Sequence, residues 1–210
     1  MLVAFDFDGT LSDSEMVVEL ADRQDAASEV ATITERAMND EIAYAESLRQ
    51  RCGLLEGLEL PTAETVFEGV RLRPGTGDVL ADLAGAGVRS AILTGGFERG
   101  VRGALAAAGT DVETIVANRL VDDGERLTGA VEGPLIEGTK DDALEVLAAA
   151  EGVPLEDTVA VGDGANDLPM LERAGLAIGF DPKPAVEPAC DVVVESMPEL
   201  GDVLQDRGVY

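Results

Sequence analysis

The chain has 210 residues with 42 acidic and 15 basic side chains, giving a formal net charge of −27 at pH 7, and it contains no histidine. This excess of negative charge would repel a phosphate backbone, so we expect no nucleic-acid partner. The acidic residues are dispersed along the chain, which we interpret as surface solvation in a salt-adapted cytoplasm. The absence of histidine excludes Ser-His and Cys-His catalysis and imidazole metal sites, leaving carboxylates, Lys, Tyr, Ser, Thr and Cys as candidate catalytic groups.

The chain also lacks the sequence features of membrane and secreted proteins. No stretch approaches the roughly 18 apolar residues that suggest a membrane span, and Met1 leads directly into the first apolar run, so we expect no leader segment. Cys52 and Cys190 are isolated, which indicates free thiols in a reducing compartment. We therefore expect a cytoplasmic protein with no membrane partner, and the sequence leaves its oligomeric state open between a monomer and a homodimer.

The predicted elements begin with a strand over residues 2–5, a continuous apolar run typical of a strand buried on both faces of a parallel sheet. From residue 12 to residue 73 apolar residues recur at helical spacing, which predicts a small helical bundle. Strands and helices then alternate. The expected strands are 88–93, 114–117, 158–161, 176–178 and 191–194, the expected helices are 98–108, 139–150 and 167–174, and residues 119–131 are expected to form a β-hairpin.

This alternation predicts an α/β fold with a doubly wound, mostly parallel, Rossmann-like sheet. Ligands in such sheets bind beyond the carboxyl ends of the strands. The helical segment follows the first strand directly, so it would lie above that site as a lid. We predict a core formed by residues 1–12 and 74–210 and a helical cap formed by residues 13–73.

Two acidic residues follow the first strand in the segment FDFDGT, residues 5–10. Asp6 and Asp8 are two residues apart on an extended chain and therefore project to the same side. Like charges at a buried strand end require a cation or a shared proton. A carboxylate can attack phosphorus, and a second one can exchange a proton with the leaving oxygen. A plain acidic turn or helix cap would account for one of these residues but not for both.

Two later segments are suited to phosphate. Thr94, Gly95 and Gly96 follow the strand at 88–93 and would expose main-chain N–H groups beside a helix N-terminus, although an ordinary strand–helix turn explains them nearly as well. Lys140 lies in the first turn of the helix predicted at 139–150, where its charge opposes the helix dipole. A phosphate beyond the helix would explain this position, and a solvated surface lysine is the alternative.

The segment GDGAND, residues 162–167, follows the strand at 158–161. Asp163 lies at the carboxyl end of this strand, and Asp167 shares a face with it if the turn is helical. Mg2+ prefers oxygen ligands and keeps some waters, so a few carboxylates suffice to bind it. We therefore favour metal binding for Asp163, whereas Asn166 is explained about equally well as a helix cap.

In this order the four segments resemble the signature of the haloacid dehalogenase superfamily of phosphatases, and the resemblance spans residues 5–167. Within the superfamily the chain is most similar to the phosphoserine phosphatase family. The segments that carry this similarity are 159–167, 94–97, 117–120, 127–129 and the Ser-Leu-x-x-Arg pattern at 47–51.

The resemblance implies a role for each candidate residue. Asp6 would be the nucleophile that forms an aspartyl-phosphate, and Asp8 the general acid/base. Mg2+ would be held by Asp6, the main-chain carbonyl of Asp8, and Asp163, with Asp167 in support. The implied phosphate-binding residues are Thr94, Gly95, Gly96, Lys140 and Asn166. The implied substrate-binding residues are Glu15 for the ammonium group, Arg51 for the carboxylate, and Met38 and Tyr44 in the cap pocket.

The implied substrate is a small phosphomonoester, O-phosphoserine, hydrolysed in the last step of serine biosynthesis. An amino acid needs one anionic and one cationic partner, and the planar guanidinium of Arg51 suits a carboxylate. Gly9 and Thr94 depart from the serines that are common in that family. A phosphatase for phosphoglycolate or a sugar phosphate, a phosphotransferase or phosphomutase, and a catalytically silent binding module remain alternatives.

Overall fold

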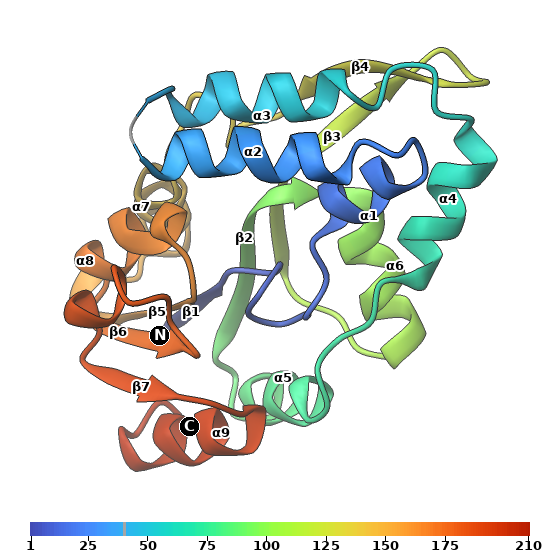
Figure 1. Cartoon of the computed structure of the whole chain (residues 1–210). Helices are drawn as coiled ribbons and strands as arrows, with labels where there is room; N and C mark the ends of the chain where they lie inside the picture. The colour runs from blue at the N-terminus through green and yellow to red at the C-terminus, as the bar shows by residue number, and fades with distance from the viewer. Residues whose placement is uncertain (40) are drawn as a thin grey trace.

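A computed structural model describes residues 1–39 and 41–210 and shows an α/β fold with one seven-stranded sheet (Figure 1). The strands are β1 Leu2–Phe5, β2 Arg89–Phe97, β3 Thr114–Asp122, β4 Leu127–Glu132, β5 Thr158–Gly162, β6 Leu176–Phe180 and β7 Val192–Val194. Their spatial order is β4-β3-β2-β1-β5-β6-β7. Every neighbouring pair is parallel except β3 and β4, which form an antiparallel hairpin. The predicted fold class is confirmed.

In the described part of the chain, the first four helices follow β1 and end before residue 74. They are α1 Met16–Asp22, α2 Ala27–Met38, α3 Tyr44–Gly53 and α4 Leu60–Gly69. The later helices are α5 Thr76–Gly85, α6 Glu98–Ala108, α7 Lys140–Glu151, α8 Leu168–Arg173 and α9 Met197–Asp206. Figure 1 shows α2 and α3 side by side above the edge of the sheet toward which β2 points, and α4 beside α6.

Several predicted boundaries differ from the structure. The prediction that a strand ends at Leu93 is wrong, because β2 continues to Phe97 and pairs again with β3 after a register shift. The strand predicted at 114–117 and the first arm of the hairpin are one strand, β3, which pairs with β2 and then with β4. The helix predicted at 98–108 matches α6, whereas α5 and α9 lie outside the predicted elements.

Both faces of the sheet are buried under helices. Alternate residues of β1 point to opposite faces, so Leu2 and Ala4 pack with α7 and α8, while Val3 and Phe5 pack with α5, α6 and α9. This burial on both faces explains why β1 is continuously apolar.

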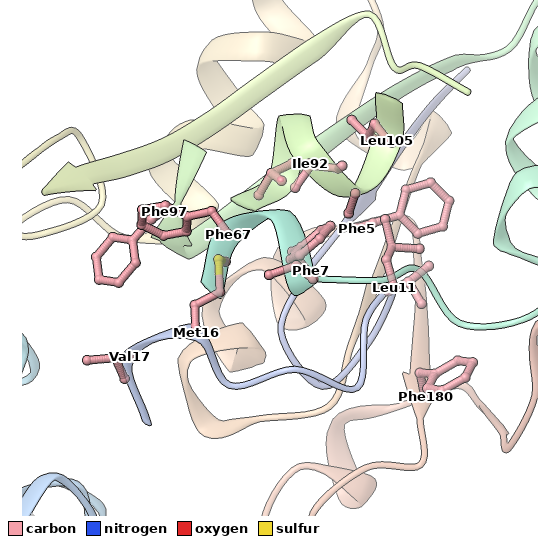
Figure 2. Packing of buried hydrophobic residues seen from close by; sticks show 14 of the residues in the cluster. Phe5, Phe7, Leu11, Met16, Val17, Phe67, Ile92, Phe97, Leu105 and Phe180 are labelled. Atoms are coloured by element: carbon pink, nitrogen blue, oxygen red, sulfur yellow. The ribbon is translucent and has the colours of Figure 1, made fainter. Parts of the chain in front are cut away.

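The larger core continues from the sheet into the helices between β1 and α5. Met16 of α1 and Phe67 of α4 belong to the same buried cluster as Phe5 and Phe97 (Figure 2). The rings of Phe67 and Phe97 meet edge to face, with centroids 6.4 Å apart. Helices α1 and α4 are therefore packed firmly on the sheet layer, and the boundaries at residues 12/13 and 73/74 stay a prediction.

The strand order places a reversal at the centre of the sheet. The chain moves from β1 to β2 and β3 on one side and then returns to β5 on the other side of β1. Ligands bind beyond the carboxyl ends of strands at such a switch point. The residues that follow β1 and β5 are therefore expected to face a common site. In the described part of the chain no helix has the length and apolar character needed to cross a bilayer.

Candidate active site

Three carboxylates meet at the switch point between β1 and β5. Asp6 follows β1 directly, Asp163 follows β5, and Asp167 ends the short 3-10 turn that precedes α8. All three residues are buried, and one carboxylate oxygen from each lies within 4.8 Å of the others. The parallel pairing of β1 with β5 produces this cluster, because it brings together two strand ends that are far apart in the sequence.

Lys140 projects from the first turn of α7 into this cluster. Its ammonium group is ion-paired with Asp6 and lies 2.5 Å from Asp167 Oδ1. Burial opposes the charged form, but the charges of Asp167 and Asp6 outweigh it and raise the pKa of Lys140 above its ordinary value. The alternative of a solvated surface lysine is wrong, since the side chain is only 4% exposed.

The cluster holds more negative than positive charge. Burial, with the charge of Asp167 added, raises the pKa of Asp6 well above its ordinary value although Lys140 opposes the shift. Burial also raises the pKa of Asp163, whose carboxylate lies 3.1 Å from the half-exposed ammonium group of Lys183. Buried carboxylates that are costly to ionise together form a donor set suited to a divalent cation. The residues present therefore fit Mg2+.

Glycines allow the carboxylates to lie against neighbouring loops. Gly9 has a φ of 88°, and a Cβ atom there would come within 2.7 Å of the Asp163 carboxylate. A Cβ atom on Gly162 would likewise collide with the side chain of Asp167. Asp167 Oδ2 accepts hydrogen bonds from the main-chain N–H groups of Asp163 and Gly164 at 3.0 and 2.9 Å. Gly9 and Gly162 therefore leave the space that the carboxylates of Asp163 and Asp167 occupy.

Asp8 lies apart from the three-carboxylate cluster, beside the loop at 94–96. Ser14 Oγ donates a hydrogen bond to Asp8 Oδ1 at 3.1 Å, while Oδ2 faces Gly96 so closely that a Cβ atom there would collide with it. Burial and then the charge of Glu15 raise the pKa of Asp8 to about 7. A carboxyl group of this pKa can both give and take a proton near neutral pH.

The candidate phosphate loop is an extension of β2. The N–H group of Gly96 donates to the Thr94 hydroxyl at 2.9 Å. The side chain of Asn118, buried on β3, donates to the carbonyls of Gly95 and Leu135 at 3.0 and 3.2 Å and accepts from the Leu135 N–H at 3.1 Å. Asn118 and Lys183 are absent from the predicted site residues. A polar side chain within a strand is the signal that could have pointed to Asn118.

The helices above the sheet bring some predicted substrate residues to this site. The hydroxyl of Tyr44, at the start of α3, lies directly against Gly95. Glu15, just before α1, is near enough to Arg51 and Lys183 for their charges to oppose the rise in its pKa that burial produces. Met38 at the end of α2 and Asn166 are exposed, and their contacts with substrate and phosphate stay predictions.

The chain is similar in sequence and in structure to known phosphoserine phosphatases. Residues 3–172 match the model of the haloacid dehalogenase-like hydrolases. A phosphoserine phosphatase from Halobacterium salinarum is 56% identical over 208 residues and is matched over 99% of each chain. One from Methanocaldococcus jannaschii is 37% identical over 97% of this chain and 96% of its own length. A solved phospho-aspartyl intermediate analogue of phosphoserine phosphatase is 38% identical, with a TM-score of 0.87 over 96% of this chain and 97% of that chain.

Proposed function

Because this chain belongs to the haloacid dehalogenase-like hydrolase family, we propose that it is a Mg2+-dependent phosphatase that hydrolyses O-phosphoserine to serine and phosphate. The observation that carries the proposal is the buried contact of Asp6 with Lys140 beside Asp163 and Asp167. This arrangement fits a carboxylate nucleophile held at the end of a strand. The similarity to phosphoserine phosphatases along almost the whole chain supports the choice of substrate.

The first half of the reaction transfers the phosphoryl group to the enzyme. A carboxylate oxygen of Asp6 attacks phosphorus as the bond from phosphorus to the serine oxygen breaks. Asp8 gives its proton to that leaving oxygen, so serine departs as a neutral alcohol and Asp8 is left ionised. The pKa of about 7 supports Asp8 as the proton donor.

The second half hydrolyses the aspartyl-phosphate. Asp8, now ionised, takes a proton from a water molecule that attacks phosphorus. The bond from phosphorus to the Asp6 oxygen breaks, and phosphate leaves while both side chains return to their starting protonation states. The same carboxyl group thus acts as acid and then as base.

The remaining groups stabilise charge on the transferred phosphoryl group. Lys140 and the N–H groups of the loop at 94–96 would face its equatorial oxygens, where positioning and electrostatic stabilisation provide most of the catalysis in phosphoryl transfer. Asp6 and Asp163, with the Asp8 carbonyl and the support of Asp167, would hold Mg2+. The bound ion would offset negative charge on the phosphate oxygens.

Recognition of the amino acid is assigned to the helices above the sheet. Glu15 would pair with the substrate ammonium group and Arg51 with its carboxylate, while Met38 and Tyr44 would line the pocket. Phosphoglycolate and sugar phosphates lack an ammonium group, so Glu15 has no partner on them. The position of Glu15 near Arg51 therefore favours an amino-acid ester over these alternatives.

The direct experiment is release of inorganic phosphate from O-phosphoserine, measured in concentrated KCl with Mg2+ and with a chelator. We expect release that requires Mg2+ and exceeds that from phosphoglycolate or sugar phosphates. Phosphate release that does not depend on Mg2+, or faster release from another ester than from O-phosphoserine, would contradict the proposal. Added alcohols test the phosphotransferase alternative, which predicts new phosphate esters in place of free phosphate.

A further inference from the structure

Two buried serines connect Asp8 to the main chain of Arg71. Ser14 Oγ donates to Asp8 Oδ1 at 3.1 Å, and the hydroxyl oxygens of Ser14 and Ser12 are 2.9 Å apart. Ser12 Oγ in turn donates to the carbonyl of Arg71 at 2.7 Å, and its oxygen accepts from the Ser14 N–H at 3.2 Å. Both serines are buried. Because both hydroxyl protons are donated in these contacts, the hydrogen bond that joins the two serines is the one from the Ser14 N–H to Ser12 Oγ, and through it Asp8 is connected to residue 71.

Residue 71 lies where the chain returns from α4. The guanidinium group of Arg71 donates to the carbonyls of Glu68 and Val70 and so attaches this residue to the end of α4. The returning segment pairs with the outgoing one, because the N–H of Arg73 donates to the Leu11 carbonyl at 2.8 Å. The position of the Arg71 carbonyl is therefore tied to the position of α4.

The contact with Ser14 also selects which oxygen of Asp8 faces the phosphate loop. With Oδ1 held by Ser14, Oδ2 is the oxygen directed at Gly96. A proton donor must lie within hydrogen-bond reach of the leaving oxygen, so the orientation of this carboxyl group matters as much as its acidity. Without the Ser14 hydroxyl, Asp8 Oδ1 loses this side-chain donor, and the main-chain N–H of Met16 is left as a donor to the carboxyl group.

We propose that Ser14 and Ser12 are positioning residues for the proton transfer. Ser14 holds the carboxyl group of Asp8 with Oδ2 toward the leaving oxygen, and Ser12 ties this orientation to the return segment of α4. The inference rests on the phosphatase activity proposed above. It deepens that proposal by adding a link between the reacting groups and the helices that cover them.

The test compares two leaving groups. The serine oxygen is a poor leaving group that needs a proton in order to depart, whereas p-nitrophenolate leaves readily without one. The ratio kcat/KM reports the transfer of the phosphoryl group to Asp6 and excludes the later hydrolysis of the aspartyl-phosphate, which both substrates share. Because general acid catalysis typically contributes 100-fold or more, Ser14→Ala is expected to lower kcat/KM for phosphoserine about tenfold more than kcat/KM for p-nitrophenyl phosphate. Ser14→Thr keeps a hydroxyl and is expected to restore much of the wild-type ratio. A merely structural role would slow both substrates alike.

Ser90→Ala is the matched control. Ser90 is also buried and its hydroxyl also donates to a carboxylate, that of Glu113 at 2.8 Å, but it lies at the opposite end of β2 from the phosphate loop. Its substitution is expected to leave the ratio of the two kcat/KM values unchanged. Ser12→Ala is expected to shift the ratio in the same direction as Ser14→Ala, and it serves as the second variant if Ser14→Ala does not fold.

The outcomes separate this inference from the proposed function. If the wild type hydrolyses phosphoserine but Ser14→Ala lowers kcat/KM equally for both substrates, or for neither, the positioning role is wrong. If Ser12→Ala leaves the ratio for the two substrates unchanged, Ser12 does not link the orientation of Asp8 to α4. A wild type that hydrolyses neither substrate with Mg2+ would instead overturn the proposed function itself.

Discussion

At the scale of single residues, the site is dominated by buried charges that compensate one another. Lys140 contacts two carboxylates that would otherwise face each other without a buried cation. Removing one partner from a buried ion pair is strongly destabilising, because the remaining charges lose their compensation. Lys140 is therefore expected to serve both the stability of the protein and its chemistry.

Lys140→Ala is predicted to lower kcat by about 100-fold to 1,000-fold, comparable with the loss of an oxyanion-hole donor. It should also lower the free energy of unfolding by about 3–5 kcal/mol in chelator, since Asp6 and Asp167 become uncompensated. Steady-state kinetics and denaturant unfolding measure these two effects. Lys183→Met is the control, because Lys183 is half exposed in its ion pair with Asp163 and should cost far less stability. Equal destabilisation by both variants would contradict this account.

Arg51 is predicted to act on substrate binding instead of chemistry. Arg51→Ala should raise KM for phosphoserine at least tenfold and leave hydrolysis of p-nitrophenyl phosphate nearly unchanged, because the aryl ester has no carboxylate to bind. Arg49→Ala is the matched control on the same helix, since Arg49 is exposed and paired with Glu137 2.5 Å away. An equal loss on both substrates would argue against a carboxylate contact.

At the scale of elements, the apolar strand β1 and helix α6 could be predicted closely because their patterns are local. The extent of β2 could not be predicted, because Gly95 and Gly96 are typical of a turn and the strand continues only through its pairing with β3. Helix α9 was within reach of sequence reasoning. Its N-cap Ser196 accepts from the Glu199 N–H at 3.4 Å, and its buried Leu200 and Leu204 are four residues apart.

The candidate site divides in the same way. The strand-end positions of Asp6 and Asp163 can be predicted from the sequence, because an apolar run precedes each residue. The contacts of Asn118 and Lys183, and those of Ser14, depend on segments that meet only in the folded chain. A polar residue within a strand can single out Asn118, but its hydrogen-bond partners, like those of Lys183 and Ser14, are set by the folded chain and cannot be predicted from sequence patterns alone.

Asn118 is predicted to hold the phosphate loop in place. Asn118→Ala would leave the Gly95 carbonyl and the Leu135 N–H without this partner, which should lower the free energy of unfolding by about 1–3 kcal/mol. It should also weaken competitive inhibition by inorganic phosphate. Asn39→Ala, at the exposed C-terminal end of α2, is the control and should change neither property. Unchanged phosphate affinity in Asn118→Ala would show that the loop does not need this residue.

At the scale of the whole molecule, the net charge of −27 sets the response to salt. Most of the ion pairs in the described part of the chain are on the surface, where each contributes only about 0–1 kcal/mol. Repulsion among the excess carboxylates acts over the whole surface and is screened as ionic strength rises. Salt weakens the surface ion pairs and also reduces the repulsion among the carboxylates. The stability lost through the first effect should be smaller than the stability gained through the second.

The midpoint of thermal unfolding is predicted to rise steadily as KCl is increased from 0.05 M to about 2 M, where the Debye length falls below about 3 Å. Circular dichroism follows the transition at each concentration. Sucrose at matched osmolality separates charge screening from solute exclusion and should reproduce only part of the rise. A midpoint that is unchanged or falls with KCl would contradict the role assigned to the surface charge.

In the proposed reaction Asp6 carries the phosphoryl group during turnover. Quenching the enzyme during phosphoserine hydrolysis and reducing it with borohydride converts an aspartyl-phosphate to homoserine, which peptide mass spectrometry locates. We predict that the conversion occurs at residue 6, requires phosphoserine and Mg2+, and is lost in Asp6→Asn. Conversion at Asp163 or Asp167 in place of Asp6, or sustained turnover by Asp6→Asn after deamidation is excluded, would contradict this role of Asp6.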